Sequence, residues 1–172
     1  MSRLARILDS MPEIGDGVQT DPTILELHGE IEFRNISFVH KNALTPALSN
    51  INLTVRRGMT LAVVGYTGSG KSTLVNLIPR LYDATGGELL IDGINIKSIP
   101  LEVLRTHIGY VPQETFLFSE TLTENISYGV DNGSEQHVVE AAGISQLASD
   151  VSEFPKAFET MIGERGITLS GG

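Results

Sequence analysis

The first half of the chain contains a run of residues whose types and spacing suit the binding of phosphate groups. The run is Gly65-Tyr66-Thr67-Gly68-Ser69-Gly70-Lys71-Ser72-Thr73, which fits the pattern Gly-x-x-x-x-Gly-Lys-Ser. Its glycines lack a Cβ, so the backbone can adopt positive φ and bring N–H groups close to an anion. In this pattern Lys71 reaches the β- and γ-phosphates of a nucleoside triphosphate, and the hydroxyl of Ser72 ligates Mg²⁺.

The residues on either side of this glycine run fit a strand before it and a helix after it. The apolar run Leu61-Ala62-Val63-Val64 predicts a buried strand, and Leu74, Leu77, Ile78 and Leu81 have the spacing of one helix face. A Gly-Ser linker that contains a lysine by chance is the alternative interpretation, but it explains neither flank. The sequence therefore predicts a site for a nucleoside triphosphate such as ATP, with Mg²⁺.

Length, composition and charge narrow the class of protein. The chain has 172 residues, 41% of them hydrophobic and 19% charged, which suits one globular domain. It has no cysteine, so disulfides and thiolate metal sites are excluded. The net charge of −9 argues against non-specific binding to nucleic acid. No apolar run approaches the length of a membrane helix, and charges at Arg3, Arg6 and Asp9 argue against a secretory signal.

Alternating and helical patterns elsewhere predict an antiparallel sheet followed by a helical region. Alternation predicts strands within residues 29–40 and 48–57, and the turn dipeptide Asp92-Gly93 predicts a hairpin over residues 88–96. A continuous apolar run predicts that residues 59–64 form a strand buried on both faces. The other expected elements are a strand at 108–111 and helices at 101–107, 121–127, 134–142 and 144–152.

The end of the chain carries a second motif, Leu169-Ser170-Gly171-Gly172, far downstream of the glycine run. Between the two lies Val111-Pro112-Gln113. In this order the three motifs resemble the nucleotide-binding domain of ATP-binding cassette (ABC) transporters, and the resemblance covers residues 28–172. Further runs are similar to the exporter branch of that family, in which membrane and nucleotide domains share one polypeptide. These runs are residues 6–10, 110–114, 117–118, 124–126 and 160–166.

The resemblance implies an α/β fold and a division of the chain. The fold would be a P-loop NTPase core, with a mixed sheet and an antiparallel β subdomain, plus a helical subdomain; the C-terminal part of the domain would be missing. Residues 1–27 would be a connector from a preceding transmembrane domain, and residues 28–172 a partial nucleotide-binding domain. Within it, the β subdomain and P-loop core would cover 28–112, the glutamine loop and helical subdomain 113–168, and the start of the signature motif 169–172.

The resemblance also implies roles for residues outside the glycine run. Gln113 would contact the magnesium ion and orient the attacking water, so that it would be catalytic together with Lys71; the alternative is a polar residue that only follows a strand. Ser170, Gly171 and Gly172 would contact the γ-phosphate of ATP held by a second nucleotide-binding domain. Two domains would then enclose two ATP molecules in a head-to-tail dimer.

His40 departs from the pattern of the family, which usually has an aromatic residue at this position to stack on adenine. A histidine ring has a π-face and could replace it with a smaller stacking area. The alternative interpretation is an exposed histidine at the end of a strand.

The hydrolytic residues that the family carries after an apolar strand are not in this sequence, which contains no Asp-Glu pair. We therefore expect a piece of an exporter in which ATP hydrolysis drives transmembrane export, with the nucleotide domain on the cytosolic face of the cell membrane. The 172-residue chain itself is expected to be soluble and to bind ATP without hydrolysing it efficiently. Two other hypotheses stay open: a soluble ABC ATPase without membrane domains, and a non-hydrolysing nucleotide-binding module.

Overall fold

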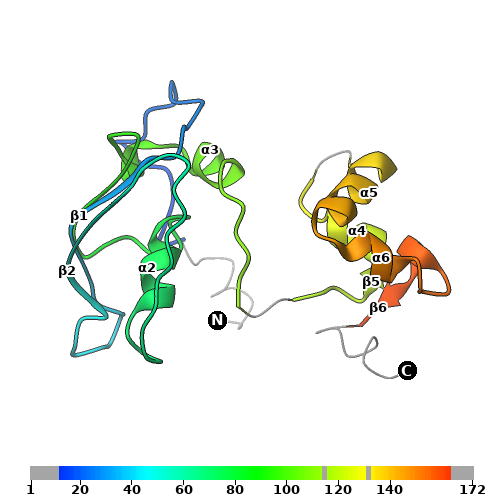
Figure 1. Cartoon of the computed structure of the whole chain (residues 1–172). Coiled ribbons are helices and arrows are strands. Elements are labelled where there is room, and N and C mark those ends of the chain that lie inside the picture. The colour runs from blue at the N-terminus through cyan, green and yellow to red at the C-terminus, as the bar shows by residue number, and fades with distance from the viewer. Residues whose placement is uncertain (1–11, 114–115, 131–132, 164–172) are drawn as a thin grey trace, which may run out of the picture. The chain divides into compact units, whose positions relative to one another are not determined.

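The computed structural model describes residues 12–113, 116–130 and 133–163, which divide into two units (Figure 1). The first unit extends to Tyr110 and contains a β-sheet with helices α2 and α3. The second unit begins at Val111 and contains helices α4, α5 and α6. Each unit has its own group of buried apolar side chains.

Strand β1 (Ile31–Phe38) lies at the centre of the four-stranded sheet of the first unit, which has the order β2-β1-β3-β4. It pairs antiparallel with β2 (Leu48–Val55) on one side and with β3 (Gly86–Ile91) on the other, and β3 pairs with β4 (Ile94–Asn95). The predicted antiparallel strands and the hairpin at Asp92-Gly93 are therefore confirmed. The ladder with β2 is irregular after Phe33 and the ladder with β3 after Arg34, both close to Asn35, which has a φ of 50°.

The inward face of this sheet packs against two short helices. Helix α2 (Lys71–Leu77) contributes Leu77 to the core, and α3 (Leu101–Thr106) contributes Leu104. The short 3₁₀ helix η1 (Ile96–Ser98) precedes α3. Ile36 of β1 is fully shielded from solvent among these side chains, as the alternation of apolar residues along β1 predicts.

Two predicted strands of the first unit are wrong. Residues 59–64 and 108–110 have no regular secondary structure, and neither does Val111 at the start of the second unit. A strand buried on both faces of a parallel sheet exists only between partner strands, and no described strand pairs with either run. The apolar side chains of the first run are accordingly exposed, with Leu61 at 47% and Val64 at 87%.

The second unit is mainly helical, as predicted, but it also contains a short strand pair. Helices α4 (Leu122–Ser127), α5 (Glu135–Ile144) and α6 (Leu147–Val151) are followed by the 3₁₀ helix η2 (Ala157–Glu159). Ser134 caps α5 by accepting a hydrogen bond from the backbone N–H of His137, which confirms the predicted start. Strands β5 (Glu120–Thr121) and β6 (Met161–Ile162) pair antiparallel and were not predicted.

The side chain of Asp92, in the turn between β3 and β4, holds the segment that leads into β1. Its carboxylate accepts hydrogen bonds from the backbone N–H groups of His28 at 2.6 Å, Gly29 at 3.3 Å and Glu30 at 3.0 Å. Burial raises the pKa of Asp92, but the hydrogen bonds from His28, Glu30 and Gly29 outweigh it, so the pKa lies below its ordinary value of 3.8. The charged form of the Asp92 carboxylate therefore stabilises the folded state.

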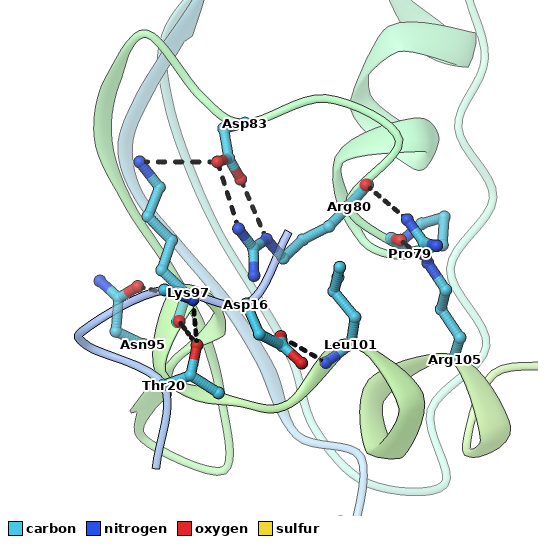
Figure 2. A network of polar contacts seen from close by, with 10 residues as sticks. Asp16, Thr20, Pro79, Arg80, Asp83, Asn95, Lys97, Leu101 and Arg105 are labelled. Atoms are coloured by element: carbon cyan, nitrogen blue, oxygen red, sulfur yellow. Dashed lines mark hydrogen bonds and ion pairs between the residues drawn. The ribbon is translucent and has the colours of Figure 1, made fainter. Parts of the chain in front are cut away.

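The N-terminal segment, defined as residues 12–27, is also held against η1 and the start of α3 (Figure 2). The carboxylate of Asp16 accepts a hydrogen bond from the backbone N–H of Leu101, at the start of α3, at 2.9 Å. The backbone N–H of Asp21 donates to the carbonyl of Ser98 at 2.8 Å. Ile24 and Leu27 pack against the apolar core. This part of the chain, predicted to be a connector, thus contacts the sheet unit at several points.

We expect Asp92→Asn to lower the free energy of unfolding at neutral pH and to flatten its dependence on acid. Because the pKa of Asp92 is lower in the folded state, its stabilisation is fully present above 3.8 and is lost as the pH falls below that value. Urea unfolding at a series of pH values measures this difference between the two proteins. Glu26→Gln is the control, since the exposed Glu26 carboxylate makes no hydrogen bond among the described residues. A constant difference between wild type and Asp92→Asn from pH 7 down to pH 3 would contradict the assignment.

Candidate functional site

The phosphate loop, residues 65–70, ends against the first residues of β2. Gly70 precedes α2 with a φ of 88°, a conformation that side-chain-bearing residues rarely adopt. A Cβ on Gly70 would lie 2.5 Å from the carbonyl oxygen of Ala47 and 3.0 Å from the side chain of Leu48. The glycine is therefore required both by the turn and by the close approach of the loop to the sheet.

The ammonium group of Lys71 lies inside this loop. Its Nζ donates hydrogen bonds to the carbonyl oxygens of Gly65 and Tyr66, both at 2.8 Å. These are neutral acceptors, whereas a phosphate oxygen carries charge and forms a stronger hydrogen bond with an ammonium group. The geometry places a cation where the pattern of the glycine run requires one.

A pocket of about 250 Å³ lies over the start of α2 and is lined by residues 68–73 together with His40 and Ala47. Ser72 is exposed, and its hydroxyl makes no hydrogen bond among the described residues, so it is available as a ligand for Mg²⁺. No group of three histidine, aspartate or glutamate side chains in the described part of the chain could hold a metal ion. The fit to Mg²⁺ therefore depends on oxygens from a nucleotide in addition to this hydroxyl, as is usual for this ion.

His40 lies at the edge of the same pocket. Its Nε2 is 3.3 Å from the hydroxyl oxygen of Thr73, in the first turn of α2. The ring contacts Phe38 and Tyr82 at centroid distances of 4.8 Å and 5.6 Å, at nearly right angles to both. Neither neighbour stacks in parallel on the imidazole, so stacking on a nucleotide base stays a prediction that this geometry allows.

The other predicted site residues do not line the loop pocket or lie outside the described residues. Tyr66 and Thr67 are exposed on the loop, and Gln113 is exposed in the second unit, where its proposed role stays a prediction. Ser170, Gly171 and Gly172 lie outside the described residues.

Sequence reasoning did not single out Ala47 or Tyr82. The available signal for Tyr82 was an aromatic residue directly after Leu81, the last residue of the helix face that the sequence predicts.

A glycine loop that leads into a helix beside an α/β core, with a lysine cation enclosed by the loop, defines the class of P-loop nucleotide-binding domains. A family profile described as ABC transporter matches residues 48–172. The chain therefore belongs to the ABC transporter family, as its motifs predicted.

Individual relatives agree with this assignment. The ATP-dependent lipid A-core flippase of Syntrophus aciditrophicus (strain SB) is 46% identical over an alignment of 172 positions, which covers 99% of this chain and 28% of that protein. A solved structure of a bacterial Atm1-family ABC exporter with ATP bound matches with a TM-score of 0.86 and 33% sequence identity. That match covers 98% of this chain and 29% of the solved chain. The chain thus spans less than a third of the length of each of these proteins.

We expect Gly70→Ala to lower the free energy of unfolding by about 2–4 kcal/mol, because a Cβ would add a clash with Ala47 to the strain of a positive φ. Gly68→Ala is the matched control, since Gly68 has a φ of 81° but open space around an added Cβ. Its loss should be only the backbone strain of about 1–2 kcal/mol. Urea denaturation of the three proteins measures both values. Equal losses in the two variants would show that the loop does not depend on its contact with β2.

Proposed function

We propose that this chain is the ATP-binding part of an ABC exporter, in which ATP binding and hydrolysis drive transport across a membrane. The observation that supports the proposal most directly is the enclosed ammonium of Lys71 beside the free hydroxyl of Ser72. Two similar proteins point the same way: one is named an ATP-dependent flippase, and the other is an exporter with ATP bound.

In this proposal the residues of the chain divide the work of holding the triphosphate. Lys71 leaves the carbonyls of Gly65 and Tyr66 and pairs with the β- and γ-phosphates, while the N–H groups of the loop donate to phosphate oxygens. Ser72 holds Mg²⁺, which when bound neutralises charge that develops on the phosphates. Gln113 contacts the magnesium ion and orients the attacking water through its uncharged amide.

The remaining parts of the machinery would come from other domains. We infer that a second nucleotide-binding domain pairs head to tail with this one, so that Ser170, Gly171 and Gly172 of each chain contact the γ-phosphate held by the other. A transmembrane domain of the same polypeptide would place the site on the cytosolic face of the cell membrane. No helix among the described residues is long and apolar enough to cross a bilayer.

We expect Lys71→Ala to weaken the binding of Mg-ATP by roughly ten- to one-hundred-fold, because charged hydrogen bonds to phosphate are each worth about 1.5–3 kcal/mol. Isothermal titration calorimetry with the 172-residue chain measures the dissociation constant. Lys156→Ala is the control, since Lys156 is an exposed lysine of the second unit. Unchanged affinity in Lys71→Ala, with wild-type folding by circular dichroism, would refute the proposed site.

We also expect the 172-residue chain to release no phosphate from ATP above the level of the buffer. The resemblance to ABC transporters implies that hydrolysis needs an aspartate and a general-base glutamate after an apolar strand. The sequence contains no Asp-Glu pair. A phosphate-release assay with magnesium measures the rate. Magnesium-dependent turnover that disappears in Lys71→Ala would contradict this expectation.

A further inference from the structure

Helix α2 carries phosphate-binding side chains at its start but no cation of its own at its end. Lys71 and Ser72 lie in its first turn, and its last turn contains no basic residue that could bond to carbonyl groups there. Arg105 of α3 supplies this interaction from outside. Its Nε donates to the carbonyl of Pro79 and its Nη2 to the carbonyl of Arg80, both at 3.1 Å (Figure 2). The chain directly after α2 is therefore held by a side chain from another helix.

The turn that Arg105 holds has an unfavourable backbone conformation. Arg80 has a φ of 49°, which is uncommon for a residue with a side chain. Its guanidinium is buried and pairs with Asp83 at 3.0 Å. A conformation of this kind persists only where the surrounding structure fixes it. Arg105 is one of the groups that fix it, and with it the end of α2.

Helix α3, which carries Arg105, lacks a side-chain cap of its own at its start. Pro100 occupies the N-cap position and makes no such hydrogen bond. The carboxylate of Asp16 takes this place, because it accepts a hydrogen bond from the backbone N–H of Leu101 at 2.9 Å (Figure 2). A negative charge at the start of a helix is also favoured by the helix dipole. The N-terminal segment thus fixes the start of α3, and α3 in turn fixes the end of α2.

The N-terminal segment does not bond to the end of α2 by a more direct path. Residues 12–14 and residues 81–83 both line a cavity of about 720 Å³ beyond His40. Among the described residues no hydrogen bond or ion pair joins these two stretches. The segment is bonded at this cavity to Lys41, through an exposed ion pair with Glu13 at 2.6 Å. The bonded route from the segment to α2 therefore runs through α3.

We propose that Arg105 is a positioning residue of the phosphate site, and that α3 couples the N-terminal segment to the affinity for the nucleotide. This inference rests on the proposed function, in which Lys71 and Ser72 hold the triphosphate and Mg²⁺. A binding site tolerates displacements of only about 0.5 Å, and the seven residues of α2 move as one short element. The coupling is reciprocal: release of the segment from α3 lowers the affinity for Mg-ATP, and bound Mg-ATP holds the segment more firmly.

The first test removes the two hydrogen bonds of Arg105. Arg105→Met keeps an unbranched apolar side chain without donors and should weaken the binding of Mg-ATP by about five-fold. Inorganic tripolyphosphate should lose the same factor, because the change acts on the phosphate end of the site. Arg105→Lys keeps a cation that can donate to a carbonyl, and it should restore most of the affinity. Isothermal titration calorimetry of the full chain with each ligand measures these values.

Two controls separate positioning from loss of charge and from loss of stability. Arg57→Met removes an exposed arginine of the same unit that makes no side-chain hydrogen bond or ion pair among the described residues. Ile36→Val destabilises the core of this unit at a residue of β1. Neither should change the affinity for Mg-ATP in protein that is fully folded by circular dichroism. A loss in either control as large as in Arg105→Met would overturn the positioning role.

The second test determines whether Asp16 acts through Arg105. Asp16→Ala frees the start of α3 and should weaken the binding of Mg-ATP by about two- to three-fold, but it should have no further effect in Arg105→Met. Glu26→Ala is the control for the change in charge, since Glu26 is an exposed carboxylate of the same segment without a hydrogen bond among the described residues. Additive losses in the double variant would overturn the coupling.

Hydrogen exchange measures the same coupling from the N-terminal segment and needs only the wild-type chain. The backbone N–H of Leu101, which donates to Asp16, should exchange about two- to three-fold more slowly in saturating Mg-ATP. NMR of the labelled protein with and without nucleotide measures this rate. An unchanged rate at Leu101 would contradict the coupling.

The outcomes separate this inference from the function on which it rests. If Lys71→Ala leaves the affinity for both ligands unchanged, the phosphate site itself is wrong. If Lys71→Ala weakens binding and Arg105→Met does not, the phosphate site stands and the positioning role of Arg105 is refuted.

Discussion

The position of the phosphate loop depends on the close approach of Gly70 to Ala47, where an added Cβ would lie only 2.5 Å from the carbonyl oxygen of Ala47. This contact brings the N-terminus of α2 to the beginning of β2, where no larger residue fits. In the first turn of α2, the hydroxyl of Thr73 lies 3.3 Å from the ring of His40, which follows the end of β1. Since β1 and β2 pair along most of their lengths, the loop and the histidine are both fixed by the same ladder. The antiparallel sheet thus sets the distance between the phosphate end and the base end of the proposed ligand site.

The ammonium group of Lys71 is hydrogen-bonded by backbone carbonyl groups of the loop itself. Lys71 donates to two carbonyl groups, so binding a phosphate exchanges these hydrogen bonds for charge-assisted ones and does not create them from nothing. The net gain in free energy is therefore the difference between two sets of hydrogen bonds, to which the N–H groups of the loop add. The free-energy cost of holding the charged Lys71 in the loop is small, because its ammonium group has hydrogen-bond partners there.

The sequence was informative where structure depends on residues near one another in the chain. The turn at Asp92-Gly93, the cap at Ser134 and the alternation in β1 were all predicted, because each is a local preference. The strand predicted at residues 59–64 was wrong, because an apolar run shows that a segment can be buried but not which neighbouring strand would bury it. The pairing of β5 with β6 and the ion pair between Glu13 and Lys41 join residues that are far apart in the sequence, and no local pattern indicates either. For the site, the glycine run identified the phosphate end, while the cavity beyond His40 became visible only in three dimensions.

Arg80 gives a physical reason for the shape of that cavity. It is buried, has a φ of 49°, and its Nη1 has no hydrogen-bond partner among the described residues, which together are costly for a charged side chain. Its other guanidinium nitrogens bond to Asp83 at 3.0 Å and 3.3 Å, and its carbonyl accepts a hydrogen bond from Arg105 of α3 (Figure 2). These bonds fix both ends of the short segment that carries Tyr82. The strain at Arg80 is therefore best understood as the cost of turning the chain sharply after α2, so that Tyr82 lies beside His40 at the cavity.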